Sequence, residues 1–205
     1  SHKRAQEARE GGDWGEAREL LKAEAERGRA DAANAVGEFY VLGRGVPVSA
    51  PEAEKWFVRA ADAGHSVAQL NLATLYMAGA PGVKKDEERG RFLLRASAEA
   101  GNAIAQFRLG DLIQRDGSKL DRTVDRMEHF REARDWFQKA AAQNHPDATP
   151  ELARYTDEGV AGERDPVKAT DLYFEAARAG SVVAMNEIGV RYQRGLGMRQ
   201  DNVAA

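Results

Sequence analysis

The sequence predicts an all-α fold, an α-α superhelical solenoid of stacked antiparallel helix pairs. Two observations predict it: small residues recur with a period near 36 residues, and helix-capping residues recur with the same period. The period is marked by residues that tolerate the left-handed end of a helix. These markers are Gly28, Gly64, Gly101, Asn144 and Gly180, at intervals of 36, 37, 43 and 36 residues.

Each marker is followed by the pattern of a helix, which we name the first helix of a repeat. Alanine stands four residues after the marker, and glycine or alanine stands nine after it, so this helix can approach a neighbour closely. Mostly large residues eight and twelve after the marker lie one turn apart, as a buried helix face requires. The residues at the +8 position are Val36, Leu72, Leu109, Leu152 and Ile188.

A second helix precedes each marker. Its start is indicated fifteen residues before the marker, where four of the five positions hold an N-cap residue. These residues are Asp13, Ser49, Asp86 and Asp165, whereas His129 stands fifteen residues before Asn144. Its buried face is predicted at the bulky −8 position, which holds Leu20, Trp56, Leu93, Trp136 and Leu172. These patterns predict eleven helices, at residues 3–10, 14–27, 30–42, 50–63, 66–78, 87–100, 103–115, 129–143, 147–158, 166–179 and 182–194.

We expect residues 1–205 to form a single repeat array of about five units. Its expected divisions are a partial unit at 1–28, then 29–64, 65–101, 102–144, 145–180 and a truncated unit at 181–205. Asp201 lies six residues after Gly195, as Asp165 lies six after Gly159. We therefore expect Asp201 to cap a further helix and the chain to be a fragment of a longer array.

The third full unit contains an insertion at residues 116–130. Ser118 and Asp121 have the spacing of a helix capping box. The residues after Ser118 contain an apolar stripe at helical spacing, formed by Leu120, Val124 and Met127. Residues 119–128 are therefore expected to be helical, either extending the second helix upstream or forming a short separate helix. The missing cap at His129 favours the extension.

Charge and composition exclude several classes of function. The formal net charge is −3 and the pI is about 5.9, so no basic surface for nucleic acid is expected. The chain has no cysteine, which excludes disulfides, thiolate metal sites and cysteine nucleophiles. No segment has the length and apolarity of a membrane span, so no membrane insertion is expected. A bacterial envelope or periplasmic location and a cytoplasmic one both stay open.

The chain offers few candidates for chemistry. His65 and His145 follow repeat markers, which favours a structural role for both over catalysis. His129 has Asp125 four residues earlier but no further neighbour at metal-ligand spacing. No nucleophile-elbow, phosphate-loop or zinc-protease motif occurs. We expect no catalytic residue, no cofactor and no metal, and hence no enzyme.

Segments of the repeat resemble a known family. "AGHSVAQLNLATLYMAGAPGVKKD" and "AGSVVAMNEIGVRYQRGLGMRQD" are similar to the Sel-like repeat, a relative of the tetratricopeptide repeat. The residues that match its pattern are Ala32 to Tyr40, Gly43-Arg44-Gly45-Val46, Lys55-Trp56 and Gly64-His65. The resemblance implies a scaffold or adaptor that binds a partner protein or peptide. Cysteine-rich relatives suggest an alternative, an envelope-associated hydrolase or a binder of cell-wall fragments or β-lactams, but this chain lacks their cysteines.

By the same analogy, the first helices should line a concave binding face. The partner-binding residues expected there are Asn34, Val41, Leu70, Met77, Ile104, Phe107, Arg154 and Asn186. Leu70 and Phe107 could equally pack between adjacent first helices, whereas exposure is favoured for Met77. Self-association through the C-terminal end of the array is a further possibility.

Overall fold

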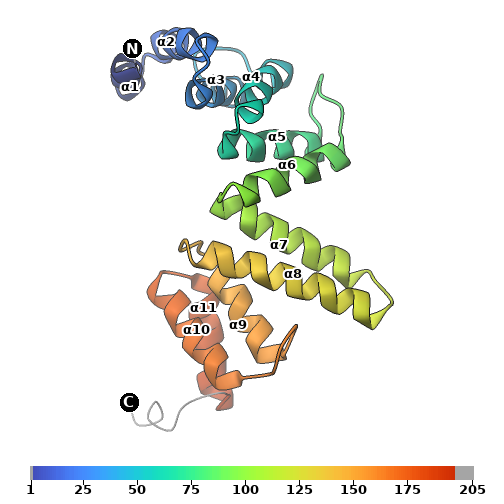
Figure 1. The fold of residues 1–205 in the computed structure, drawn as a ribbon. Helices are drawn as coiled ribbons and strands as arrows, with labels where there is room; N and C mark the ends of the chain where they lie inside the picture. Colours follow the sequence, from blue (N-terminus) through green and yellow to red (C-terminus); the bar gives the residue numbers. More distant parts are fainter. Residues whose placement is uncertain (1, 197–205) are drawn as a thin grey trace. The chain divides into compact units, whose positions relative to one another are not determined.

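The computed structural model describes residues 2–196, and these residues form eleven α-helices and no strand (Figure 1). The helices are α1 (His2–Glu10), α2 (Trp14–Glu26), α3 (Ala30–Leu42), α4 (Ala50–Asp62), α5 (Ser66–Ala78), α6 (Glu87–Glu99), α7 (Ala103–Ser118), α8 (Thr123–Ala141), α9 (Ala148–Glu158), α10 (Pro166–Arg178) and α11 (Val182–Arg194). They fall into two compact units, residues 2–102 and residues 103–196 of the described chain. The prediction of an all-α fold is confirmed. Asp201 lies outside the described residues.

The five markers lie in the turns that connect each second helix to the first helix of the next repeat. All five have positive φ angles, between 60° at Asn144 and 95° at Gly28. An L side chain rarely adopts this left-handed conformation, which is why glycine or asparagine recurs there. The spacing of the repeat therefore follows from the backbone geometry of these turns.

The predicted N-caps of the second helices are also confirmed. Asp13, Ser49, Asp86 and Asp165 each accept a hydrogen bond from the backbone N–H three residues ahead. This bond satisfies one of the free donors at the helix start.

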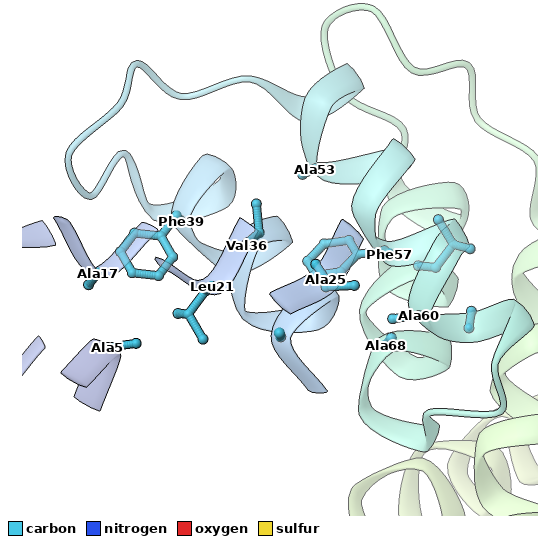
Figure 2. Packing of buried hydrophobic residues seen from close by; sticks show 14 of the residues in the cluster. Ala5, Ala17, Leu21, Ala25, Val36, Phe39, Ala53, Phe57, Ala60 and Ala68 are labelled. Carbon is cyan, nitrogen blue, oxygen red and sulfur yellow. The ribbon is translucent and has the colours of Figure 1, made fainter. Parts of the chain in front are cut away.

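In the first unit, the helices pair as α1 with α2, α3 with α4 and α5 with α6. Buried alanines and a few large side chains fill the space between them, as Figure 2 shows for Leu21, Val36, Phe39 and Phe57. Because alanine is small, the helix backbones approach closely and the core needs few aromatic residues.

In the second unit, α7 pairs with α8 and α9 with α10, while α11 packs on α10. The rings of Phe137 and Tyr155 meet edge to face, with centroids 5.8 Å apart, and join α8 to α9. A smaller cluster of Ala153, Tyr173 and Ala184 joins α9, α10 and α11.

The buried face of the second helices is rotated by one residue from the prediction. The −7 position, not the −8 position, is buried in all five cases, by Leu21, Phe57, Leu94, Phe137 and Tyr173. In the −8 position only Trp136 is buried. The reason is visible at the +9 glycines: a Cβ on Gly37 would lie 2.5 Å from the Phe57 ring, and one on Gly110 would lie 2.8 Å from the Phe137 ring. The aromatic ring therefore occupies the space that each glycine leaves open.

The insertion extends one helix pair, as the missing cap at His129 favours. α8 begins at Thr123 and runs without a break through His129, while α7 continues to Ser118. Gly117 is buried and a Cβ there would lie 2.7 Å from His129 Cβ, so glycine keeps the lengthened helices in contact. The capping-box prediction is wrong, because Ser118 ends α7 and its hydroxyl donates to the Gln114 carbonyl. Residues 119–122 form the turn between the two helices.

Candidate partner-binding surface

The first helices α3 and α5 share a surface in the first unit. Asn71 Nδ2 donates to Asn34 Oδ1 at 3.0 Å, and Asn34 Nδ2 donates to Glu38 at 2.9 Å. Asn34 is buried, so the structure assigns it to the joint between two helices and not to an open binding face. The bond orients the half-buried Asn71 amide beside this joint.

Exposed aliphatic side chains gather at the end of α3. Val41 is 48% exposed, and Leu42 and Val48 are more exposed still. Val48 packs over the turn at Gly43, where its Cγ2 lies 2.9 Å from the place of a Cβ. We name Val41, Leu42 and Val48 the α3-end patch. Val41 was predicted in this role, whereas Leu42 and Val48 were missed because the repeat pattern assigned them to no face.

Two predicted anchors in α5 belong to the interior. Leu70 was expected either to face a partner or to pack between helices. It is only 6% exposed, so the structure supports packing. Met77 was expected to be exposed, and this is wrong: it is half-buried against α6, in contact with the position where Gly90 lacks a Cβ. The absent side chain of Gly90 draws Met77 into the helix pair.

In the second unit, Ile104 is exposed on α7 while Phe107 is half-buried. The Phe107 ring stacks on His145, with centroids 4.6 Å apart and planes 16° apart, and also contacts Phe137. Burial lowers the pKa of His145, and Arg108 adds to this effect while Asp147 opposes it. His145 Nδ1 also accepts a hydrogen bond from the Asp147 backbone, so His145 has a structural role.

Arg154 joins α9 to α7. Its guanidinium donates to Gln114 Oε1 at 2.9 Å and forms ion pairs with Glu151 and Glu158. The predicted arginine is therefore half-buried and already paired within the unit. A ligand carboxylate would have to compete with Glu151 and Glu158 for it.

Arg191 joins α11 to α9 and was not predicted. Its side chain is 0% exposed, and its Nη2 lies 2.6 Å from Asp157 Oδ2. Nη1 donates to Thr170 and to the Pro166 carbonyl, and the guanidinium lies 4.9 Å above the Tyr173 ring. Neither Nε nor Nη2 has the alignment of a hydrogen bond. These two atoms therefore contact Glu187 and Asp157 as ion pairs without hydrogen-bond geometry. Asn186, the last predicted residue, is exposed on α11.

A shallow hollow of about 560 Å³ lies between Tyr76 and the loop that leads into α6. Tyr76 donates its hydroxyl to Glu54 at 2.7 Å, and burial raises the pKa of Tyr76 to about 12. The phenol thus stays protonated near neutral pH and serves as a structural donor.

Within residues 2–196, no three histidine, aspartate or glutamate side chains lie close enough together to hold a metal ion.

None of the helices between residues 2 and 196 is both long enough and apolar enough to cross a bilayer.

Comparison with known families identifies the repeat. The sequence model of the Sel1 repeat matches residues 30–65, 66–102, 103–145, 151–181 and 182–205. These segments together cover well over half of the chain.

Solved structures agree with this match. A Sel1 repeat protein from Oxalobacter formigenes superposes with a TM-score of 0.85 at 24% identity, covering 97% of this chain and 79% of that one. A protective antigen of uropathogenic Escherichia coli with an SLR fold gives a TM-score of 0.78 at 31% identity, covering 91% of this chain and 38% of that one. These likenesses confirm the solenoid class of the fold.

A relative was also found by sequence. An uncharacterised protein of Neisseria meningitidis is 24% identical over 75% of this chain, which spans 37% of that relative. The chain thus matches little more than a third of the relative's length.

Proposed function

The chain belongs to the Sel1 repeat family, whose repeats are generally non-catalytic protein-interaction modules, and we propose that it is a scaffold that binds a peptide segment of a partner protein. The binding surface is the solvent-facing side of the first helices α3 and α5 in the first unit, and the α3-end patch holds an apolar side chain of the partner.

The observation that carries this proposal is the exposure of the α3-end patch. Val41, Leu42 and Val48 are aliphatic, close together in sequence and open to solvent, whereas the other exposed large apolar side chains of the first unit, Val67 and Phe92, lie on other helices. Exposed apolar patches with polar neighbours are typical of partner sites. Asn71 is held by Asn34 on the same face, where an oriented amide can bond the backbone of an extended peptide.

The charges of the second unit favour a polypeptide over a polyanion. Arg154 is paired with Glu151 and Glu158, and Arg115 is paired with Asp111 at 2.7 Å. Paired arginines release few counterions, so they give little of the affinity that nucleic-acid binding requires.

The test begins with affinity purification of partners on the full chain, followed by calorimetric titration of the recovered polypeptide. A Val41→Asp/Leu42→Asp variant should weaken binding at least tenfold, because a buried anchor contributes about 1–2 kcal/mol or more. Both residues are exposed, so folding should be unchanged by circular dichroism.

The matched control is Val124→Asp. Val124 is 66% exposed on α8, which is a second helix in the other unit, and an acid is compatible with the first turn of a helix. Equal binding by both variants would contradict the proposed surface. Recovery of a cell-wall fragment in place of a polypeptide would contradict the proposed class of partner.

A further inference from the structure

The shallow hollow beside Tyr76 lies wholly within the first unit, and we name it the Tyr76 hollow. Glu54 of α4 and Tyr76 of α5 form one side of it. The end of the α5–α6 loop and the first turn of α6 form the other side, with Lys84, Lys85, Asp86, Glu87, Glu88 and Arg89. All eight side chains are polar or charged, so the hollow suits a polar ligand.

The loop between α5 and α6, which carries the two lysines, has a fixed shape (Figure 1). Ala80 and Val83 exchange two backbone hydrogen bonds, of 3.0 and 2.8 Å, around the turn Pro81-Gly82. Gly82 has a φ of 80°, as the second central residue of a type II turn requires. Val83 is 5% exposed and packs in the core cluster of the first unit. Lys84, the next residue, is therefore attached to a well-anchored backbone.

Arg89 is oriented by the ring of Tyr76. Its guanidinium carbon lies 4.6 Å from the ring centroid, in a cation–π contact. The Tyr76 hydroxyl donates to Glu54 at 2.7 Å, which holds the ring in turn. Within residues 2–196, neither the Arg89 guanidinium nor the Lys84 ammonium forms an ion pair. Both cations therefore keep N–H donors for a ligand.

Four acidic residues also line the hollow, and three of them have other partners. Glu54 accepts the tyrosine hydroxyl. Asp86 caps α6 by accepting a hydrogen bond from a backbone N–H of its first turn. Glu87 pairs with Arg91 at 2.9 Å and lies 3.9 Å from the Lys85 ammonium. These contacts offset much of the negative charge that would otherwise oppose an anion.

Glu88 is the fourth acid, and the described chain gives it no ion-pair partner. Its charge opposes a ligand with two negative charges, such as a phosphate group, more than one with a single charge. A carboxylate carries one charge, and its planar shape matches the guanidinium of Arg89. The lining therefore favours a carboxylate over a phosphate.

The hollow adjoins the surface that we assign to the partner peptide. A Cβ on Gly82 would lie 2.6 Å from Pro51 Cγ, so the α5–α6 loop contacts the start of α4. Val48 of the α3-end patch lies three residues before Pro51. Counted back from the marker that follows each loop, Lys85 has the position that Val48 has one repeat earlier. Successive repeats thus present an apolar side chain and then a cation from the same loop position.

We propose that the Tyr76 hollow binds the carboxylate of a glutamate or aspartate side chain in the partner peptide. Lys84 and Arg89 bind the carboxylate, while the α3-end patch holds a neighbouring apolar side chain. This inference rests on the proposed function for the identity of the ligand as a peptide. It adds that the recognised segment combines an acidic residue with an apolar one.

The probe is N-acetylglutamate methylamide, which has one side-chain carboxylate and no charged terminus. Titrated into the nitrogen-15-labelled full chain at low salt, it should shift the amide signals of residues 84–89 saturably, with a dissociation constant on the order of 1–10 mM. N-acetylglutamine methylamide has the same shape without the charge and should cause no saturable shift. Equal shifts from both compounds, or no saturation by the glutamate up to about 50 mM, overturns the proposal. Tighter binding of inorganic phosphate at the same residues also overturns it, because the hollow would then select phosphate.

Variants of the full chain test the charges one at a time. Arg89→Gln should weaken binding of the glutamate probe about threefold or more, whereas Glu88→Gln should strengthen it about twofold. The matched control is Lys55→Gln, which removes one positive charge from an exposed position on α4 outside the hollow. Its binding should equal that of the wild type. If Lys55→Gln weakens binding as much as Arg89→Gln does, net charge explains the binding and the hollow does not.

The polypeptide recovered by affinity purification gives a second measurement. Arg89→Gln should weaken its binding about threefold or more, and less so at about 0.5 M salt than at 0.05 M. Equal binding of the partner to wild type and Arg89→Gln overturns this proposal and leaves the α3-end patch standing. Weakening by Arg89→Gln with no effect of Val41→Asp/Leu42→Asp supports the carboxylate site and counts against the α3-end patch alone.

Discussion

The two units of the chain join their successive first helices with different chemistry. In the first unit the joint between α3 and α5 is a hydrogen bond between two amides, Asn34 and Asn71. In the second unit Arg154 joins α9 to α7, and a fully buried Arg191 joins α11 to α9 through Asp157. The same repeat geometry is therefore maintained by neutral groups in one unit and by ionised groups in the other.

This difference separates what the repeat dictates from what it leaves free. Caps, left-handed turns and the fit of a large −7 side chain against a small +9 residue recur in both units. The half-buried to exposed +13 position and the exposed +14 position do not: they are Val41-Leu42 and Met77-Ala78 in the first unit, and Gln114-Arg115, Asp157-Glu158 and Gln193-Arg194 in the second. The surface can therefore vary for recognition while the core spacing stays fixed.

The largest expected effect tests whether both units depend on the same core contact. Phe57→Ala in the first unit and Phe137→Ala in the second should each cost about 3–5 kcal/mol, because both rings are buried against a glycine. Urea unfolding would measure the loss, and hydrogen exchange should show it in the mutated unit first. Trp56→Ala should cost less than Phe57→Ala, since Trp56 is only half-buried. The reverse order would contradict the assignment of the −7 face.

The second effect compares two glycines at the same +9 position. Gly110→Ala should destabilise the chain by about 1–3 kcal/mol, because the new methyl would overlap the Phe137 ring. Gly189→Ala should stabilise it by about 0.5–1 kcal/mol, since the new Cβ would meet no atom of residues 2–196 within 4 Å and alanine favours a helix. Thermal unfolding of both variants would show opposite signs. A loss of stability at Gly189 would mean that another part of the chain already packs against this glycine.

The third effect sharpens the contrast between neutral and charged joints. Asp157→Ala should cost about 1–2 kcal/mol, because it leaves Arg191 buried with a weaker partner in Glu187, 3.4 Å from Nε. This is below the cost for a fully buried pair, since Asp157 is partly exposed. Asn71→Ala should cost about 1 kcal/mol and be independent of salt. When the free energy of unfolding is measured between about 0.05 and 0.5 M salt, the cost of Asp157→Ala should change more than that of Asn71→Ala.

The eleven helices could be predicted to within a few residues, apart from the extended pair α7–α8, because their ends depend on local chemistry. An N-cap such as Asp165 and a left-handed marker such as Gly180 act within one turn of backbone. The face of each second helix was harder to predict, since the −8 and −7 positions both carry large residues, as in Trp56-Phe57. Neighbouring positions differ by 100° around a helix, and only the packing against Gly37 distinguishes them.

The candidate surface was predicted less well than the helices. Exposure depends on contacts between repeats, which a single repeat pattern does not contain. Asn34 and Leu70 have the spacing of a solvent-facing column, yet neighbouring helices bury both. Arg191 occupies a position that is Phe39 or Leu75 in the first unit, so its ion pair with Asp157 has no counterpart there from which to infer it.

The smallest effect concerns pH and is confined to the second unit. Burial lowers the pKa of His145 below its usual value of 6.5, so the folded chain binds a proton there less readily than the unfolded chain. The contribution of the neutral ring to stability is complete above pH 6.5 and is lost as the pH falls below it, because the unfolded chain takes up the proton first. Unfolding of the second unit, followed by hydrogen exchange between about pH 7.5 and 5.5, should become easier on acidification. His145→Gln should reduce this slope, and Phe107→Ala should also reduce it, since the ring stacked on His145 contributes to its burial. An unchanged slope in His145→Gln would assign the acid sensitivity to other groups and leave the stack with Phe107 as a packing contact alone.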